Sequence, residues 1–283
     1  MPFTSQQVSR PAGSVRSDTT LNMTTILAVV NQKGGVGKTT TVISLAHGLA
    51  IEGQRVLIVD LDTQGHVAES LGMEKAAGLY HLIVHEAGRH AVVETGRPRL
   101  HAILGDKHTV KVQRHITAEP LSEYALKRAL DPIAADYDMV ILDTAPGADV
   151  LQVNAFCACT HFLIPTKLDH LSAESANATL TTAASLQKLG ALDARFLGVL
   201  PTMWEQTTKH TRKQLKALAT QFGSLLWPPI PDDTKAREAT NEGRTLWEYA
   251  PICRALSGAS TGNGSVVGGY ARTVERLGEE MGL

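Results

Sequence analysis

The chain has 283 residues, a formal net charge of -1 and 43% hydrophobic residues, which is enough apolar material to bury a substantial core. This charge balance excludes a protein that is basic throughout, although a local basic face for nucleic acid is compatible with it. Three cysteines (Cys157, Cys159 and Cys253) are too few for a disulfide framework and favour a reducing cytoplasm, and no apolar run approaches the roughly 20 residues of a membrane span.

Residues 1–23 are polar and lack the apolar segment of a signal peptide, so we expect them to form a disordered N-terminal extension. No long low-complexity linker interrupts the rest, which predicts a single folded domain over residues 24–283. Met23 directly precedes the apolar run TTILAVV. A translation start at Met23 and a translated tail are both compatible with this pattern.

Short apolar runs alternate with longer helical patterns along the chain. Five runs are predicted to be buried strands, because each is nearly all apolar: Ile26–Val30, Val56–Val59, Met139–Leu142, Phe162–Ile164 and Phe196–Leu200. Helices are predicted over Lys38–Ile51 and over Ser172–Leu189, with Ser172 as N-cap and Gly190 just past the end. The alternation predicts an α/β fold with a mostly parallel central sheet, helices on both faces and a ligand beyond the carboxyl ends of the strands.

The segment from Glu74 to Pro120 has no clear periodicity and carries many of the 11 histidines. His81 and His85 have helical i, i+4 spacing, but no cysteine lies nearby and a zinc site needs three or four convergent ligands. We therefore expect solvated histidines here. Cys157 and Cys159, in a helix of small residues, are expected to be packing residues.

The stretch NQKGGVGKTT (Asn31–Thr40) directly follows the first strand and opens the first helix, which is the context of a phosphate-binding loop. Its glycines let successive backbone N–H groups point at phosphate oxygens, and the helix N-terminus adds a favourable dipole. Lys38 is expected to reach the β- and γ-phosphates, and the Thr39 hydroxyl to bind Mg²⁺. The nucleotide-binding residues of the loop are thus Gly34, Gly35, Val36, Gly37, Lys38, Thr39 and Thr40. A second lysine, Lys33, is not needed by such a loop.

Two further segments end strands in carboxylates. VLIVDLDTQG (Val56–Gly65) brings Asp60 and Asp62 to one strand end, and MVILDTAPG (Met139–Gly147) brings Asp143 to another. Acids at these positions can simply cap the next helix. Three strand ends that converge on one crevice instead favour a Mg²⁺–nucleotide site.

The motifs NQKGGVGKTT, DLDTQG and ILDTAPG resemble the deviant Walker A, A′ and B motifs of the ParA family of partition ATPases. The resemblance continues through PTKLDHLSAES, GVLPTMWEQTTK and IPDDTKAREATNEGRTLWEYAP, and is weakest over residues 74–120. It implies a Mg²⁺-dependent, slow ATPase whose ATP-bound form is a sandwich homodimer.

The resemblance also implies roles for single residues. Lys33 matches the signature lysine that reaches the nucleotide of the other subunit, which would supply a cation for the transferring phosphoryl group. Asp62 should orient the attacking water, Asp60 and Asp143 should assist the metal, and Pro231 should lie by the adenine. The catalytic set is therefore Lys33, Lys38 and Asp62.

This sequence departs from the family pattern at three places. His66 stands where Asn often ends the Pro-Gln-Gly-Asn motif, with Thr63 in place of the proline; Ala145 replaces the first of two prolines; and Asp232 replaces an arginine after Ile-Pro. These differences bear on the adenine contacts and on coupling to a partner.

A cationic stripe lies within the C-terminal third of the chain. Lys209, Arg212, Lys213 and Lys216 recur at helical spacing beside an apolar face of Leu215, Leu218 and Phe222, and no acid occurs between Glu205 and Asp232. An ordinary solvated face fits this pattern, but the lack of acids and the family's nonspecific DNA binding in this region favour contact with DNA phosphates. Lys235 and Arg237 are assigned to the same DNA surface.

The sequence therefore predicts a cytoplasmic, nucleoid-associated partition or positioning ATPase. ATP closes the dimer, the dimer binds nonspecific double-stranded DNA, and a ParB-like or adaptor partner stimulates hydrolysis and release. One alternative is a membrane-bound positioning ATPase like MinD, but the tail GYARTVERLGEEMGL is not cationic overall and looks like a closing core helix. A metabolic enzyme of the same fold, such as an amide-forming ligase, is the other. An iron–sulfur reductase is disfavoured because Cys157 and Cys159 are too close in sequence.

Overall fold

The computed structural model describes residues 24–260 and 265–283; the extension expected over residues 1–23 lies outside them. Its main sheet has the order β3-β4-β2-β5-β1-β6-β7, and every pair is parallel except β3–β4. The strands are β1 (Thr25–Val29), β2 (Val56–Asp60), β3 (Val93–Arg97), β4 (Leu100–Ile103), β5 (Met139–Asp143), β6 (His161–Lys167) and β7 (Arg195–Thr202). All five predicted strands and the mostly parallel α/β fold are confirmed.

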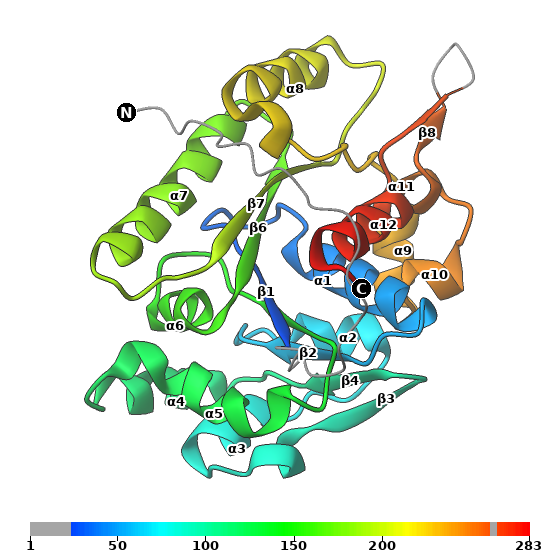
Figure 1. Cartoon of the computed structure of the whole chain (residues 1–283). Coiled ribbons are helices and arrows are strands. Elements are labelled where there is room, and N and C mark those ends of the chain that lie inside the picture. Colours follow the sequence, from blue (N-terminus) through cyan, green and yellow to red (C-terminus); the bar gives the residue numbers. More distant parts are fainter. Residues whose placement is uncertain (1–23, 261–264) are drawn as a thin grey trace, which may run out of the picture.

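Helices cover both faces of the sheet (Figure 1). One face carries α1 (Lys38–Ile51), α2 (His66–Leu71), α9 (Lys235–Asn241), α10 (Leu246–Tyr249), α11 (Arg254–Ser257) and α12 (Tyr270–Met281). The other carries α3 (Gly78–Val84), α4 (Thr109–Thr117), α5 (Ala125–Ala134), α6 (Val150–Ala158), α7 (Ser172–Lys188) and α8 (Lys209–Phe222). Three 3₁₀ turns (Gly88–Ala91, Ser122–Tyr124, Gly223–Leu225) and a small β8–β9 ladder (Ala259–Ser260 with Val266–Val267) complete the described chain.

The side chains of β1 show why the buried strands are continuous apolar runs in the sequence. Ile26 and Ala28 pack into the core under α3–α8, whereas Leu27 and Val29 pack into the core under α1 and the C-terminal helices. Because successive side chains of a strand point to opposite faces, a strand covered on both sides has no solvent-facing position.

The predicted α7 boundaries are nearly correct, but the predicted cap is wrong. Leu171 holds the N-cap position and Ser172 is the first helical residue. The Ser172 hydroxyl instead donates to the carbonyls of Lys167 (2.7 Å) and Asp169 (2.5 Å), which fixes the turn between β6 and α7. Gly190 follows the helix with φ 71°, as expected for a residue that ends a helix.

The segment without clear periodicity forms α3, the hairpin of β3 and β4, and α4. Its β3 strand, VETGR, lies at the edge of the sheet and is partly exposed, so it lacks the continuous apolar run of the buried strands. The antiparallel pairing of β3 with β4 was therefore missed.

The C-terminal helix α12 closes the core, as the sequence predicted. Val274 and Leu277 are fully buried, and α12 packs against α1 at Gly48. A Cβ on Gly48 would lie 2.6 Å from Val274 Cγ2 and 2.7 Å from Trp247 Cζ2, so the close approach of these helices requires glycine there. The apolar face of α12 is therefore covered by protein, and no described helix combines the length and apolarity of a membrane span.

Arg97, at the end of the edge strand β3, ties the sheet to the C-terminal helices. Its guanidinium donates to both carboxylate oxygens of Glu248 (2.8 and 2.9 Å) and to the carbonyls of Leu71, Thr95 and Gly243. Only 10% of its side chain is exposed. Such a planar cation can satisfy several acceptors at once, which a lysine cannot do in the same geometry.

Replacing Arg97 with alanine should lower the free energy of unfolding by about 2–4 kcal/mol, because Glu248 and three carbonyls lose their donor in a largely buried place. Chemical denaturation monitored by circular dichroism measures the loss. Arg99→Ala is the matched control, since Arg99 is exposed two residues away. Equal stability of the Arg97 and Arg99 variants would contradict a structural role for the Arg97 cluster.

Candidate active site

Strand register brings the predicted site residues to one edge of the sheet. Val29, at the end of β1, is the register partner of Asp143 on β5, and Asp143 is also the partner of Asp60 on β2. The two carboxylates therefore lie side by side immediately after the strand that leads into the phosphate loop. This is the convergence of three strand ends that the sequence predicted.

The loop from Asn31 to Gly37 is held from both sides. The buried Asn31 side chain donates to the Pro165 carbonyl at 2.8 Å and accepts the Lys33 backbone N–H at 2.9 Å. The Thr202 hydroxyl, from β7, donates to the Val36 carbonyl at 2.9 Å. Gly37 holds the N-cap position of α1 with φ 84°, a backbone conformation that residues with a side chain disfavour. Neither Asn31 nor Thr202 had been singled out from the sequence.

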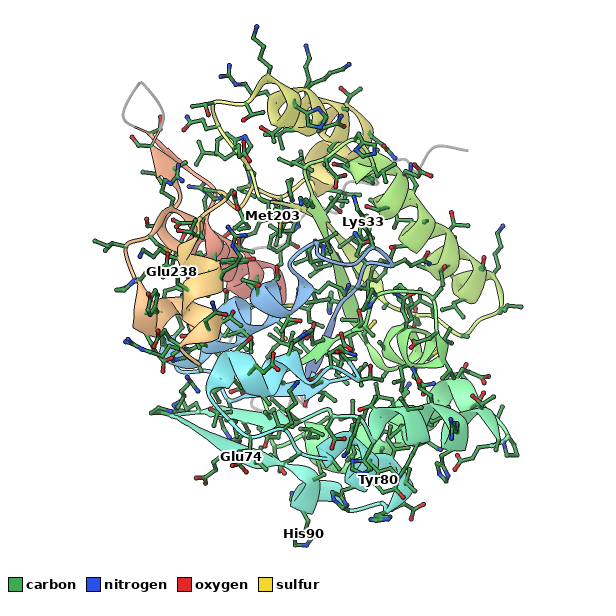
Figure 2. The ribbon with its side chains drawn as sticks, turned by 180° about the vertical axis from the view of Figure 1, so that it is seen from behind. Lys33, Glu74, Tyr80, His90, Met203 and Glu238 are labelled. Atoms are coloured by element: carbon green, nitrogen blue, oxygen red, sulfur yellow. The ribbon has the colours of Figure 1, made fainter. Side chains whose placement is uncertain are left out.

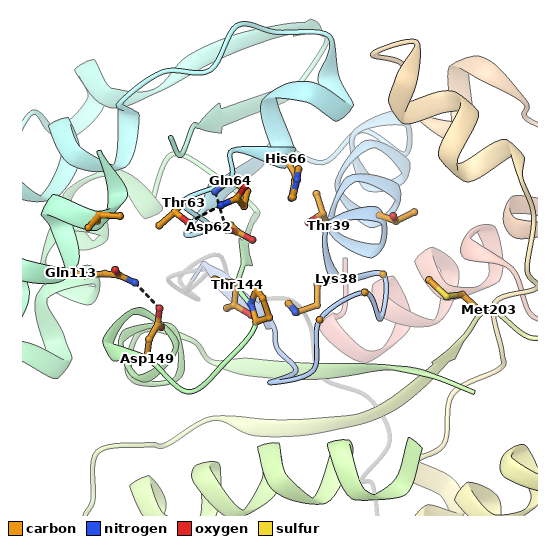
Figure 3. A pocket seen from close by; sticks show the side chains of 17 residues that line it. Lys38, Thr39, Asp62, Thr63, Gln64, His66, Gln113, Thr144, Asp149 and Met203 are labelled. Carbon is orange, nitrogen blue, oxygen red and sulfur yellow. Dashed lines mark hydrogen bonds between the residues drawn. The ribbon is translucent and has the colours of Figure 1, made fainter. Parts of the chain in front are cut away.

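A cavity of about 680 Å³ opens above this loop (Figure 3). Its lining includes the predicted loop and carboxylate residues Gly34, Gly35, Gly37, Lys38, Thr39, Thr40 and Asp62. It also includes residues that sequence reasoning did not assign to the site, namely Gln64, Val110, Gln113, Thr144, Asp149 and Met203. Val36 is buried behind the loop, so it contributes backbone rather than side chain.

Asp60 and Asp143 are completely buried. Burial, and then the charge of Asp143, raise the pKa of Asp60 well above its ordinary value. Burial raises the pKa of Asp143 to about 7, although the Thr39 hydroxyl and the Lys38 ammonium oppose this shift. Asp60 Oδ2 and both oxygens of Asp143 make no hydrogen bond of ordinary geometry within the described residues.

Buried carboxylate oxygens without partners are costly unless a cation or its water shell satisfies them. Oxygen ligands, several of them water, are what Mg²⁺ takes beside a nucleotide. Thr39, Asp60 and Asp143 therefore fit a Mg²⁺–nucleotide site, with the metal neutralising the carboxylates and the phosphates together.

Lys38 points into the phosphate end of the cavity (Figure 3). Its ammonium donates to the Lys33 carbonyl at 3.2 Å, and burial lowers its pKa despite the nearby charges of Asp143 and Asp62. A buried ammonium with a single neutral acceptor is suited to binding phosphate, because the negative charge of the phosphate compensates for the hydration that the ammonium has lost.

Asp62 lies one turn beyond β2, with its side chain on the cavity wall. Its backbone N–H donates to Asp60 Oδ1 at 2.9 Å, and its own Oδ1 accepts the Gln64 backbone N–H at 2.9 Å. Gly105 supports this turn from behind, since a Cβ there would lie 2.7 Å from the Asp62 carbonyl oxygen and 3.1 Å from Asp60 Cγ. One oxygen of Asp62 therefore remains free to bind a water at the phosphate end.

The cavity wall opposite the phosphate loop is fixed by a contact that the sequence did not reveal. Gln113 on α4 donates to Asp149 at 2.6 Å, and Asp149 caps α6 by accepting the Gln152 backbone N–H at 2.9 Å. Figure 3 shows this pair across the cavity from Lys38. The Thr144 hydroxyl, directly after Asp143, donates to the Val29 carbonyl and holds the two strand ends together.

Lys33 does not line the cavity of its own chain. Its ammonium is 2.5 Å from Asp169 Oδ2, and the two side chains are 25% and 24% exposed. Burial raises the pKa of Asp169, but the hydrogen bonds from Lys33 and from the Leu171 backbone N–H outweigh burial and hold this pKa below its ordinary value. The extra lysine of the loop thus sits at the rim of the site, in an intrachain ion pair with the start of α7.

A second cavity of about 490 Å³ adjoins the first. Gly37, Thr40 and Met203 line both cavities, and Pro231 lines the second. Met203 has φ 54°, an unusual conformation for a residue with a side chain. Pro231, which the resemblance placed by the adenine, thus lines the cavity that adjoins the phosphate loop, and its contact with adenine stays a prediction.

The residues assigned to DNA do not form one surface. Lys209, Arg212, Lys213 and Lys216 are exposed on α8, whose Leu218 is buried as predicted. Lys235 and Arg237 lie on α9, across the sheet from α8 (Figure 1). Lys235 is bonded to Glu238 at 2.6 Å, and Arg237 lines the second cavity.

The cysteines and histidines also have clear environments. Cys157 and Cys159 are buried, and burial raises the pKa of the Cys157 thiol to about 11, so both are packing residues as predicted. His81 and His85 are exposed, with their Nδ1 atoms 3.2 Å apart. Within residues 24–260 and 265–283, no three histidine, cysteine or acidic side chains are close enough to hold a metal ion together.

Comparison with known proteins agrees with this geometry. A family model described as an AAA domain matches residues 24–194. The chromosome-partitioning ATPase Soj of Thermus thermophilus is 33% identical over 226 residues, which cover 80% of this chain and 88% of that protein. The chromosome partitioning protein ParA of Caulobacter vibrioides is 32% identical over 237 residues, covering 81% and 88%. The chain belongs to the Soj/ParA family of partition ATPases.

Solved structures resemble this ParA-family chain closely. The ATP complex of a Cyanothece McdA variant superposes with a TM-score of 0.78 at 23% identity, covering 92% of this chain and 97% of that one, which establishes the fold. Cobyrinic acid a,c-diamide synthase from Mycobacterium smegmatis, solved with ADP and magnesium, is 34% identical with a TM-score of 0.69, covering 78% and 92%. Nucleotide and Mg²⁺ therefore occur in proteins of this fold.

Asp143→Asn should make the nucleotide-free protein more stable at pH 8 while impairing Mg²⁺-dependent ATP binding. With its pKa near 7 in the folded state and an ordinary value of 3.8, the carboxyl holds more protons folded than unfolded between those pH values. Stability attributable to it therefore falls as pH rises through this window. Asparagine removes that loss, so the variant's advantage should be large at pH 8 and small at pH 4.5.

Urea denaturation at the two pH values, without nucleotide, measures this difference in the free energy of unfolding. Calorimetric titration with Mg-ATP measures the accompanying loss of affinity. An Asp143→Asn protein that is less stable than the parent at pH 8 would contradict the unsatisfied state of the buried carboxylate.

Proposed function

We propose that this protein is an ATP-driven switch of the partition or cargo-positioning kind, in which ATP closes a homodimer that binds DNA. The observation that carries the proposal is Lys33. Lys38 already fills the role of the phosphate-loop lysine within its own cavity, whereas Lys33 does not line that cavity and is partly exposed. A cation in this place is positioned to act on a nucleotide held by a second copy of the chain.

The pairing of Lys33 with Asp169 supports this role. In the single chain the Lys33 charge is satisfied by Asp169 at the start of α7. Reaching a facing nucleotide requires that this ion pair opens, and because the pair is partly exposed, opening it costs little. The γ-phosphate of the facing subunit then offers Lys33 a stronger, doubly charged partner, which makes ATP binding and dimer closure one event.

Hydrolysis follows from the same residues. Asp62 binds the attacking water through its free oxygen, Lys38 and the loop amides hold the β- and γ-phosphates, and Thr39, Asp60 and Asp143 hold the Mg²⁺ shell. Water adds to the γ-phosphorus as the bond to the β–γ bridging oxygen breaks, giving ADP and phosphate. The charge that spreads over the γ-phosphoryl oxygens is stabilised by Lys38 in the same chain and by Lys33 from the facing chain.

The DNA surface is assigned to α8. Its four cations, Lys209, Arg212, Lys213 and Lys216, point away from a buried Leu218, so they can contact phosphates without disturbing the core. Arg212 also donates to the carbonyls of Gln206 (2.8 Å) and Thr207 (3.1 Å), which stiffens the loop before the helix. Dimer closure doubles this cationic surface and couples DNA affinity to ATP.

The named relatives support a partition role over the alternatives. The alignments with the Soj and ParA relatives cover most of the length of those proteins. We infer that a DNA-bound or adaptor partner stimulates hydrolysis here as well, in a cytoplasmic, nucleoid-associated setting. The buried apolar face of α12 argues against a MinD-like membrane helix. The similarity to a cobyrinic acid a,c-diamide synthase favours a second candidate, an amide-forming enzyme. ATP hydrolysis that requires an added carboxylic acid and a nitrogen donor, rather than DNA, would identify that activity.

Mixing two inactive variants tests whether Lys33 acts across the dimer. In a heterodimer of Lys33→Ala and Asp62→Ala, the site of the Lys33→Ala subunit keeps its own Asp62 and receives Lys33 from its partner. The other site carries both defects. Random pairing makes half of the dimers mixed, each with one intact site, so activity up to about a quarter of the wild-type rate should return on mixing.

Heterodimer formation is checked by pull-down through a tag on one variant only. Each variant alone, at the same total concentration, is the baseline for steady-state phosphate release. Heterodimers that form but remain inactive would mean that Lys33 acts within its own chain.

Neutralising Arg212, Lys213 and Lys216 together should weaken DNA binding equally on unrelated sequences. For each ionic interaction with a phosphate that the substitutions abolish, the slope of log affinity against log salt should become flatter by about 0.9. Fluorescence anisotropy with labelled duplexes at saturating ATP measures the slope. The matched control neutralises Arg89, Arg99 and Arg128, which are exposed on elements at the opposite end of the molecule. An unchanged slope for the α8 variant would place the DNA surface elsewhere.

A further inference from the structure

One face of the short helix α9 forms a wall of the second cavity. Ala236, Arg237, Thr240 and Asn241 line it, and their spacing puts them on a single side of the helix. The opposite side makes other contacts: the Lys235 ammonium bonds to Glu238 at 2.6 Å, and Glu238 also accepts the Tyr249 hydroxyl at 3.0 Å. In the view from behind, Met203 lies between Lys33 and Glu238 (Figure 2), and it lines both cavities.

The second cavity adjoins the phosphate cavity, because Gly37, Thr40 and Met203 line both. A ligand whose phosphates lie on the loop therefore extends past Met203 toward Pro231 and α9. A volume of about 490 Å³ lies in the range of small-molecule sites.

Two of the three acidic side chains that line this cavity already accept hydrogen bonds. Asp233 accepts the backbone N–H groups of Lys235 (3.1 Å) and Arg254 (2.8 Å), and Glu205 accepts the Thr208 hydroxyl at 2.6 Å. Asp232 is exposed after Pro231. Arg237 is also exposed, and within the described residues its side chain makes no hydrogen bond or ion pair of ordinary geometry.

We propose that Arg237 is a nucleoside-binding residue: its guanidinium closes over the mouth of the second cavity and stacks on the purine. A guanidinium is planar and weakly hydrated, and it stacks on flat π systems in a way that an ammonium does not. The proposal rests on nucleotide binding at the adjoining phosphate loop. It replaces the DNA contact that the sequence suggested for Arg237, because the residue faces the cavity rather than the cationic side of α8.

The proposal separates the two halves of the ligand. Arg237→Ala should weaken both Mg-ATP and Mg-ADP by roughly 3- to 30-fold, the range of an aromatic–cation contact from exposed to partly desolvated. Affinity for Mg-tripolyphosphate should be unchanged, because that ligand fills the phosphate cavity and has no base. Arg237→Lys should fall close to the alanine variant, since it keeps the charge but loses the plane.

Isothermal calorimetry with these three ligands is the test. Arg244→Ala is the matched control: Arg244 is an exposed arginine just after α9 that does not line the cavity and donates to the Glu248 carbonyl. It should bind all three ligands as the parent does. Lys38→Ala should instead lose tripolyphosphate and nucleotides alike, which shows that tripolyphosphate reports on the loop.

The outcomes distinguish the two levels of the proposal. A wild-type protein that binds neither Mg-ATP nor Mg-tripolyphosphate would overturn the proposed function itself. Nucleotide binding by the wild type with unchanged affinity in Arg237→Ala would overturn only the role of Arg237. Wild-type affinity in Arg237→Lys would overturn the stacking. If Arg237→Ala keeps its nucleotide affinity but its slope of log DNA affinity against log salt is flatter at saturating ATP, Arg237 belongs to the DNA surface instead.

Discussion

The rest of the site depends on two buried carboxylates, because three of their four oxygens (Asp60 Oδ2 and both oxygens of Asp143) make no hydrogen bond within the described residues. Register pairing of β2 with β5 puts Asp60 beside Asp143 at the mouth of the phosphate loop, where neither can be hydrated. Such an arrangement is unfavourable in the absence of cations, and it becomes favourable when Mg²⁺ and the phosphate-bound Lys38 are present together. On the proposed function, binding of Mg²⁺ and nucleotide at these strand ends therefore stabilises the folded sheet.

This constraint explains why so many neighbours serve only to hold the strand ends. Asn31, Thr144 and Thr202 each bond to a backbone carbonyl, and Gly105 leaves room behind Asp60 and Asp62. None of these residues has to touch the nucleotide. They keep the loop and the carboxylates in place while the charges around them change, which is the condition for electrostatic catalysis without reorganisation.

The distribution of cations around the site separates its tasks. Lys38 is buried and lines the phosphate cavity, whereas Lys33 is partly exposed, lies outside that cavity and is paired with Asp169. On the proposed function, Lys38 binds the phosphates of the nucleotide in its own chain, and Lys33 contacts the nucleotide held by the facing chain. The cations of α8 lie on the far side of the sheet from α9, so the surfaces proposed for DNA and for the nucleoside are separate and are linked through β7 and the loop that carries Met203.

The sequence by itself determined the parallel sheet, the phosphate loop and the carboxylates, because these depend on local patterns: apolar runs, a glycine-rich turn between a strand and a helix, and acids directly after strands. It missed the β3–β4 hairpin, whose edge strand lacks a buried pattern, and the cap of α7, where Ser172 bonds to the preceding turn. Only the tertiary structure decided the contacts between distant segments, such as Gln113 with Asp149, Arg97 with Glu248 and Lys33 with Asp169. It also decided that Arg237 lines the second cavity while the cations of α8 face solvent, since a sequence pattern alone does not say which surface each helix side meets.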